Sequence, residues 1–145
     1  MRLIAFRPEY QLTVENEKNR LFYQNFLQMQ QATCLPHYIE DWKAALAEVS
    51  PGFSILSDMQ VVNQASQTLR VKFQAVEQLI VQRGVSVVAE VHVPGLPTRR
   101  SCDEVTTSQV MPVRQFLTIW EAAQFLDDID ATADESTQVL IASAT

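Results

Sequence analysis

Asp58, Glu90 and His92 are the residues whose types and spacing could support acid-base chemistry. The segment VSVVAEVHV from Val85 to Val93 is rich in β-branched residues, which predicts a strand. Alternation along this strand places Glu90 and His92 on one face near its carboxyl end, where open α/β sheets usually bind ligands. Asp58 lies at the end of an earlier apolar segment, so the three side chains could line one crevice if the two strands are neighbours. The simpler interpretation, which we favour, is a partly solvated sheet face that carries polar residues.

The sequence offers no stronger candidate for metal binding or nucleophilic catalysis. Cys34 and His37 have the spacing of half a zinc site, and His92 with Cys102 could supply the other half. A Pro-Gly loop separates the second pair, so we expect no metal site. Neither cysteine has a neighbourhood that would activate a thiolate, and the three glycines are isolated and not gathered in a phosphate-binding loop. We therefore expect no enzyme activity and no cofactor.

Composition indicates one folded domain. The 145 residues are 47% hydrophobic and 19% charged, which is typical of globular proteins. The net charge is −6 and the basic residues are scattered, so nucleic acid and membrane surfaces are not expected partners. The amino-terminal apolar run is too short for a signal peptide, and the two cysteines are compatible with reduced thiols, so we expect a cytoplasmic protein.

Hydrophobic periodicity and turn signals predict alternating strands and helices. Strands are expected in a hairpin over residues 10–27 and at 53–59, 85–93 and 111–116, and helices at 35–49, 66–83, 101–109 and 118–129. Helices that alternate with strands imply parallel pairing through right-handed crossovers. We expect an α/β fold with a mixed five-stranded sheet and about four helices in residues 1–129, followed by a loose acidic tail over 130–145.

Three segments carry a resemblance to a known family. SPGFSILSDM, RGVSVVAEV and RQFLTIWEAAQFLDDI, in this order of elements, resemble the STAS-like domains related to bacterial anti-sigma-factor antagonists, over about residues 10–129. The resemblance implies a small α/β regulatory or binding domain without a cofactor. It also implies a partner surface at the loop that leads into the second helix, at Asn63, Ser66 and Thr68.

In the antagonists, phosphorylation of a serine at that helix start, within an Asp-Ser-Ser-Gly motif, switches partner binding. This chain has NQASQT, with Ser66 near the corresponding place but without the aspartate before it or the glycine after it. We expect Ser66, or Asn63, to cap the helix and not to act as a phosphoserine switch.

Two functional hypotheses follow. The first is a non-enzymatic regulatory or protein-interaction module whose partner is a protein, with a second copy of the chain as one candidate. The alternative is a small-molecule-binding domain or weak enzyme with its site at the strand ends near Asp58, Glu90 and His92.

Overall fold

A computed structural model of the chain describes residues 1–61, 63, 67–93 and 111–144, with side chains described up to residue 131. These residues form six strands and three α-helices, so the chain has an α/β fold. The elements in chain order are β1 (Arg2–Phe6), β2 (Tyr10–Glu15), β3 (Arg20–Asn25), α1 (Tyr38–Leu46), β4 (Ser54–Asp58), α2 (Gln67–Arg83), β5 (Val87–Val91), β6 (Val113–Phe116) and α3 (Ile119–Ala144). Two short 3-10 helices, η1 (Asn16–Lys18) and η2 (Leu27–Gln31), follow β2 and β3.

The strands form one mixed sheet in the order of the sequence, from β1 to β6. β1, β2 and β3 are antiparallel, and β3 to β6 are parallel. The ladder between β1 and β2 contains a β-bulge between Leu3 and Ala5. The mixed sheet is confirmed, but the prediction of five strands is wrong because β1 precedes the expected hairpin.

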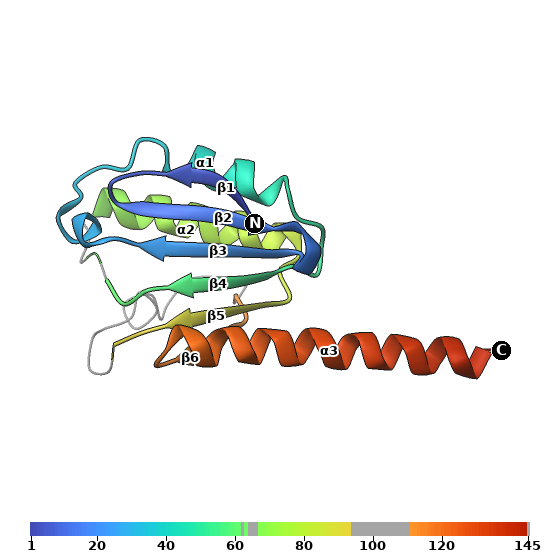
Figure 1. The fold of residues 1–145 in the computed structure, drawn as a ribbon. Helices are drawn as coiled ribbons and strands as arrows, with labels where there is room; N and C mark the ends of the chain where they lie inside the picture. The colour runs from blue at the N-terminus through green and yellow to red at the C-terminus, as the bar shows by residue number, and fades with distance from the viewer. Residues whose placement is uncertain (62, 64–66, 94–110, 145) are drawn as a thin grey trace.

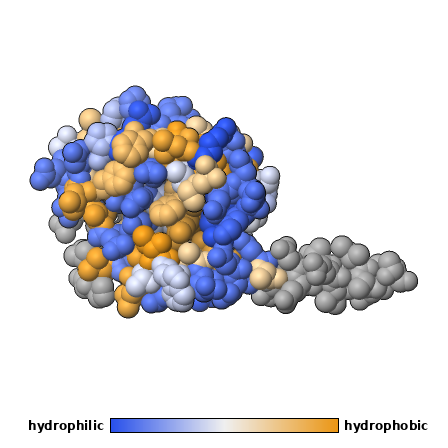
Figure 2. Space-filling view, viewed as in Figure 1, coloured by the Kyte–Doolittle hydropathy of each residue, from blue (hydrophilic) through white to orange (hydrophobic). Residues whose placement is uncertain are grey.

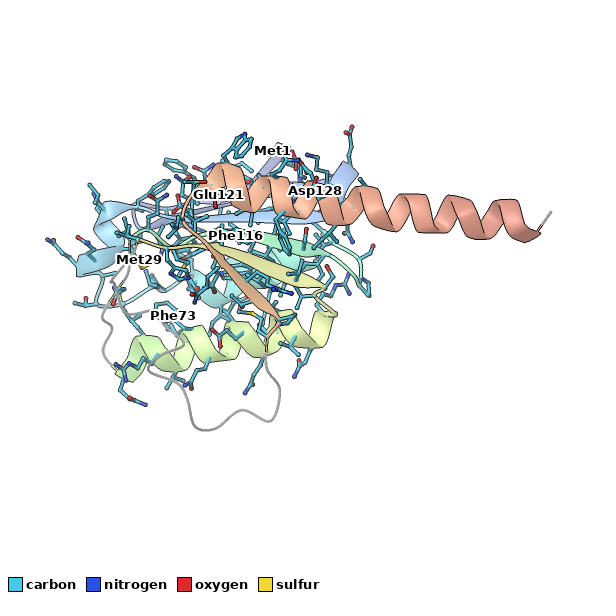
Figure 3. All side chains as sticks on the ribbon, turned by 90° about the horizontal axis from the view of Figure 1, so that it is seen from below. Met1, Met29, Phe73, Phe116, Glu121 and Asp128 are labelled. Carbon is cyan, nitrogen blue, oxygen red and sulfur yellow. The ribbon has the colours of Figure 1, made fainter. Side chains whose placement is uncertain are left out.

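The sheet lies between two helical layers. Consecutive parallel strands joined by right-handed crossovers place their connecting helices on the same face, and α1 and α2 do lie together on one face (Figure 1). Viewed from below, α3 covers the opposite face (Figure 3). The predicted helices over 35–49, 66–83 and 118–129 are confirmed, whereas the one expected at 101–109 lies outside the described residues.

Local signals explain where α2 and α3 begin or end. Gly84 directly follows α2 with a φ of +95°, and a Cβ there would lie 3.2 Å from the Cβ of Pro51. Glycine therefore both ends the helix and permits the close approach of the Pro51 turn. At the start of α3, Thr118 Oγ1 accepts a hydrogen bond of 3.1 Å from the N–H of Glu121, as the capping box predicts.

Helix α3 continues much further than the sequence indicated. Residues 130–144, where we expected a loose tail, extend the helix to Ala144. The carboxyl-terminal part of α3 projects past the end of the sheet in Figure 1. No helix among the described residues is long and apolar enough to span a membrane.

The main core lies between the sheet and the α1/α2 layer and contains an aromatic cluster. The clustered rings are Tyr10, Tyr23, Tyr38, Trp42 and Phe73, with neighbouring centroids 5.2 to 6.5 Å apart. A smaller core joins the other face to α3 and contains Leu56, Ala89, Val91, Ala122 and Leu126. Aromatic pairs at these separations add specific packing energy to burial.

Trp42→Ala is expected to lower the free energy of unfolding by about 3 to 5 kcal/mol, because the indole is buried against Tyr23 and Tyr38. Within the described part of the chain, the buried Trp42 Nε1 has no hydrogen-bond partner. Trp42→Phe should therefore cost much less, since it keeps most of the ring and removes this polar group. Denaturant melts with exposed Lys43→Ala as control test the prediction; a loss below about 1 kcal/mol for Trp42→Ala would contradict it.

Candidate functional site

Glu90 and His92 form a buried polar pair at the carboxyl end of the parallel strands. Glu90 lies near the end of β5 and His92 directly follows the strand, and two-residue spacing points both side chains toward the α1/α2 layer. His92 Nε2 lies 2.8 Å from Glu90 Oε2, and the residues are only 9% and 4% exposed. The structure thus brings together two of the three residues that we singled out for acid-base chemistry.

Asp58 lies on the other face of the sheet. β4 and β5 are neighbours as the crevice hypothesis required, but Asp58 pairs in register with Val91, whose side chain packs toward α3. Glu90 instead pairs with Ser57, one residue earlier. Asp58 Oδ1 accepts the N–H of Gln60 at 3.1 Å, which is a local turn contact. Asp58 therefore does not share a crevice with Glu90 and His92.

Further polar side chains surround the pair and bond to one another. The Asn25 amide donates to the backbone oxygen of Val61 at 2.8 Å, and its carbonyl accepts from the hydroxyl of Tyr23. Ser57 and Asn25 are buried on the same face as Glu90. Buried polar groups that bond within the protein hold a sheet end in place and do not need a ligand to satisfy them.

The strand order also argues against a ligand crevice. In doubly wound folds, the crevice opens where consecutive connections leave a strand toward opposite faces. Here β3, β4, β5 and β6 follow one another in sequence order, so the strand order does not reverse. This strand order therefore does not create a ligand crevice at the carboxyl ends of the parallel strands.

The expected partner loop is only partly described. The Asn63 side-chain amide donates to the backbone oxygens of Met29 and Ala32, and thereby ties this loop to η2. Thr68 is exposed in the first turn of α2, and Ser66 lies outside the described residues. Asn63 thus holds η2 in place through these hydrogen bonds. Sequence spacing could not predict the contact, because it joins segments about 30 residues apart.

The residues considered for a zinc site do not gather. Cys34 is exposed, His37 is the residue before α1, and His92 pairs with Glu90. Cys102 lies outside the described residues. In the part of the chain that the structure describes, no three His, Cys, Asp or Glu side chains are placed to hold a metal ion.

A second ionic cluster, which the sequence analysis missed, ties α1 to the first hairpin. Arg7 donates two hydrogen bonds to Asp41, at 2.9 and 3.0 Å, and the Tyr10 hydroxyl donates a third. Burial raises the pKa of the Asp41 carboxyl, but hydrogen bonds from Arg7 and Tyr10 outweigh burial and leave this pKa below its ordinary value of 3.8. Burial and the bond to Asp41 raise the pKa of Tyr10.

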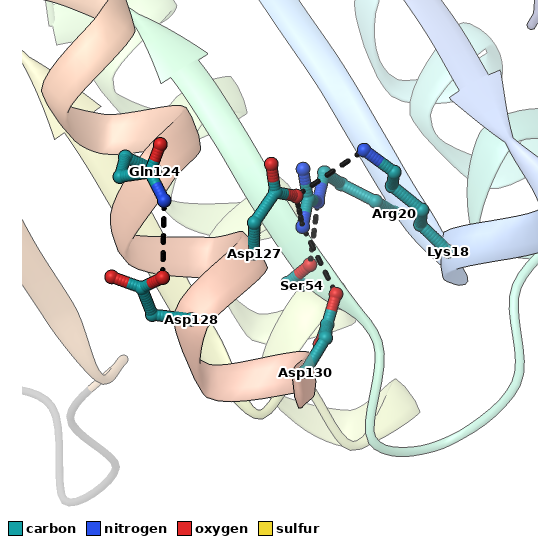
Figure 4. Close-up of polar contacts among 7 residues, drawn as sticks. All are labelled: Lys18, Arg20, Ser54, Gln124, Asp127, Asp128 and Asp130. Carbon is teal, nitrogen blue, oxygen red and sulfur yellow. Dashed lines mark hydrogen bonds and ion pairs between the residues drawn. The ribbon is translucent and has the colours of Figure 1, made fainter. Parts of the chain in front are cut away.

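A third cluster fastens α3 to the start of β3 (Figure 4). Arg20 is almost fully buried and lies 3.1 Å from Asp127 and 3.0 Å from Asp130, while Lys18 lies 3.2 Å from Asp127. Burial raises the pKa of Asp127, but hydrogen bonds from Lys18 and Arg20 lower it below its ordinary value. The acidic residues Asp127 and Asp130, on either side of the boundary between the expected helix and the expected tail, make this contact, although their partner could not be identified from sequence.

Two exposed apolar side chains lie beside α3 on the same face of the sheet. We call the α3-side face of β1, β2 and β3 the open face, because α3 lies mainly over β4, β5 and β6 (Figure 1). At its border with α3, Arg20 of β3 pairs with the helix and Phe22 packs against the smaller core. Register places the following residues on it: Leu3, Phe6, Gln11, Thr13, Glu15, Arg20, Phe22 and Gln24. Leu3 and Phe6 are 55% and 65% exposed, and apolar atoms interrupt the polar surface on this side of the molecule (Figure 2).

Comparisons of the chain with protein-family models, with curated proteins and with solved structures found no match. The site geometry therefore stands on its own, and the STAS-like resemblance stays a hypothesis.

Asp41→Asn is expected to reduce the loss of unfolding free energy that occurs as the pH falls into the acid range. A carboxylate whose pKa is lowered by folding contributes stability above its unfolded pKa of 3.8, and this contribution is lost as the pH falls through the folded-state value. At neutral pH the substitution should lower the free energy of unfolding by about 1 to 2 kcal/mol, a value kept small because solvent screens the partly exposed Arg7. The difference from the wild type should shrink below about pH 4.

Urea melts across this pH range provide the measurement, with the exposed Glu40→Gln on the same helix as control. A difference between wild type and Asp41→Asn that stays constant from neutral to acid pH would contradict the assignment.

Proposed function

We propose that this chain is a non-enzymatic protein-interaction module and that the open face is its docking surface. The observation that carries the proposal is the exposure of Leu3 and Phe6 on a sheet face without a helical cover in the described residues. Half-buried Phe26 adjoins Phe6, and the centroids of the two rings lie 5.8 Å apart. Contiguous apolar side chains on an exposed surface are typical of protein-binding sites.

The polar residues of the open face suit a docking surface. Half-buried Gln11 and Gln24 lie beside Phe6 in register, and their amide groups can bond to a partner without the desolvation cost of charges. Arg20, the buried cation on this face, is already paired with α3. A partner would therefore meet a surface that is apolar to neutral at its centre.

The regulatory role implied by the STAS-like resemblance forms part of this proposal. We expect binding without a phosphoserine switch, because NQASQT lacks the aspartate and glycine that flank the serine in the antagonists. The proposed docking surface differs from the loop at Asn63, Ser66 and Thr68, since Asn63 is engaged with η2.

The second candidate is a small-molecule site, now reduced to Glu90 and His92. Their 2.8 Å contact at the carboxyl end of parallel strands favours it. Their burial and the polar network around them favour a structural role, which is why we place this candidate second.

Phe6→Asp is expected to abolish partner binding while the domain stays folded, because the substituted side chain is exposed and a charge there opposes apolar docking. Val71→Asp is the matched control, since Val71 is 55% exposed, close to the 65% of Phe6, but lies on the outer side of α2. Affinity capture from the native host would compare wild type and both variants, with and without phosphatase. Each captured protein would then be purified and titrated directly.

The proposal requires a partner whose direct binding is kept by Val71→Asp, lost by Phe6→Asp and unchanged by phosphatase. Equal binding by the wild type, Phe6→Asp and Val71→Asp would show that the open face is not the docking surface. Binding that depends on phosphatase treatment would instead restore the switch at Ser66.

His92→Gln separates the two candidates. If the pair is structural, the substitution lowers the free energy of unfolding by roughly 1 to 3 kcal/mol, because the buried Glu90 carboxylate loses its imidazole partner. In that case no small ligand should raise the melting temperature of the wild type. A ligand that stabilises the wild type but not His92→Gln, with both proteins folded, would support the small-molecule site instead.

A further inference from the structure

Helix α3 has a projecting part with no sheet of its own to pack on. The helix contains 26 residues, and its ion pairs with the start of β3 are made by Asp127 and Asp130. The remaining residues 131–144 extend past the sheet in Figure 1 over about 21 Å, at 1.5 Å per residue. A helical segment of this length is marginal in water unless it packs against something.

The sequence of the projecting part repeats, in part, the apolar spacing by which α3 packs on its own sheet, with Ser136 and Thr137 in the intervening turn. Ala122 and Leu126 lie buried against the sheet, and Ile129, Ala133 and Leu140 follow at multiples of helical spacing. The segment 131–144 includes the apolar run Val139 to Ile141 and no basic residue. By its pattern, this segment suits an apolar sheet face.

The open face has the dimensions to accept such a helix. β2 and β3 contain six residues each, which corresponds to about 20 Å of strand, close to the length of the projecting part. Strands are about 4.8 Å apart, so one helix of about 10 Å diameter covers two to three strands. Because α3 occupies β4 to β6, one further helix fits beside it on β1 to β3.

We propose that the chain forms a symmetric dimer in which residues 131–144 of each copy cover the open face of the other. The inference rests on the proposed function of the open face and identifies its partner as a second copy. The two α3 helices then lie antiparallel and side by side, each on its own β4 to β6 and on the partner's β1 to β3. A two-fold axis perpendicular to the helix pair generates both contacts, as a closed isologous dimer requires.

A second copy is favoured over an unrelated partner because one chain carries both complementary surfaces. In the described structure α3 runs alongside the strands and away from the parallel strands' carboxyl ends (Figure 1), so its projecting part already has the direction that the exchange needs. The pairing of Arg20 with Asp127 and Asp130 fixes that direction at the point where the helix leaves the sheet (Figure 4). Each dimer buries two open faces and two projecting segments at once.

Light scattering on the full chain tests the dimer. We expect wild type and Val71→Asp at twice the monomer mass of 16.4 kDa. Phe6→Asp and Leu140→Asp should each raise the dimer dissociation constant on the order of 30-fold, as loss of a central interface residue does. Position 140 belongs to the part of α3 that projects past the sheet, so Leu140→Asp reports on the interface even if Phe6→Asp were to unfold. Circular dichroism checks the fold of each variant.

Disulfide cross-linking tests the exchanged geometry, in a background with Cys34→Ser and Cys102→Ser. A copy with Phe6→Cys mixed with a copy with Leu140→Cys should give a cross-linked pair, whereas Val71→Cys mixed with Leu140→Cys should not. A monomeric wild type, a dimer that all substitutions leave intact, or an absent Phe6 to Leu140 cross-link would each overturn the inference. If the wild type is monomeric but Phe6→Asp abolishes binding to another protein, the open face is still a docking surface and only the proposed second copy is wrong. If the wild type is monomeric and Phe6→Asp changes no binding, both proposals fail.

Discussion

The handedness of the crossovers is the constraint on which the rest of this structure depends. Right-handed connections between consecutive parallel strands bring α1 and α2 to one face of the sheet. Among the described elements, α3 is the helix that covers the opposite face, and one helix is narrower than six strands. The buried Arg20 settles where this helix lies, because its pairing with Asp127 and Asp130 holds α3 over the parallel half. An uncovered antiparallel half is the direct result.

Local patterns were sufficient to predict most elements of the fold. The apolar spacing around Trp42, the glycine after Arg83 and the capping box at Thr118 each encode a helix or its end within a few residues. β1 was missed because its side chains do not alternate cleanly, since the bulge between Leu3 and Ala5 shifts the register. The length of α3 was missed because its later turns have weak helical signals, with small and polar residues in place of a broad apolar stripe.

The arrangement of polar residues was harder to predict than the elements, because it depends on register between strands. Alternation within β5 correctly placed Glu90 beside His92. It could not place Asp58, since a shift of one residue between neighbouring strands moves a side chain to the other face of the sheet. The bonds of Arg7 to Asp41 and of Arg20 to Asp127 join residues far apart in the chain, and neither pairing has a local pattern that identifies it.

The bulge in β1 also affects how other chains can approach the molecule. An outer strand with regular geometry offers a row of free N–H and C=O groups to which a strand of another chain can add. In β1 the irregular step between Leu3 and Ala5 interrupts that row, and Pro8, which follows the strand, has no N–H to offer. Growth of the sheet by backbone pairing beyond β1 is thereby discouraged. Recognition on this side must rely on side chains, which select a partner by shape, whereas exposed backbone would accept almost any extended chain.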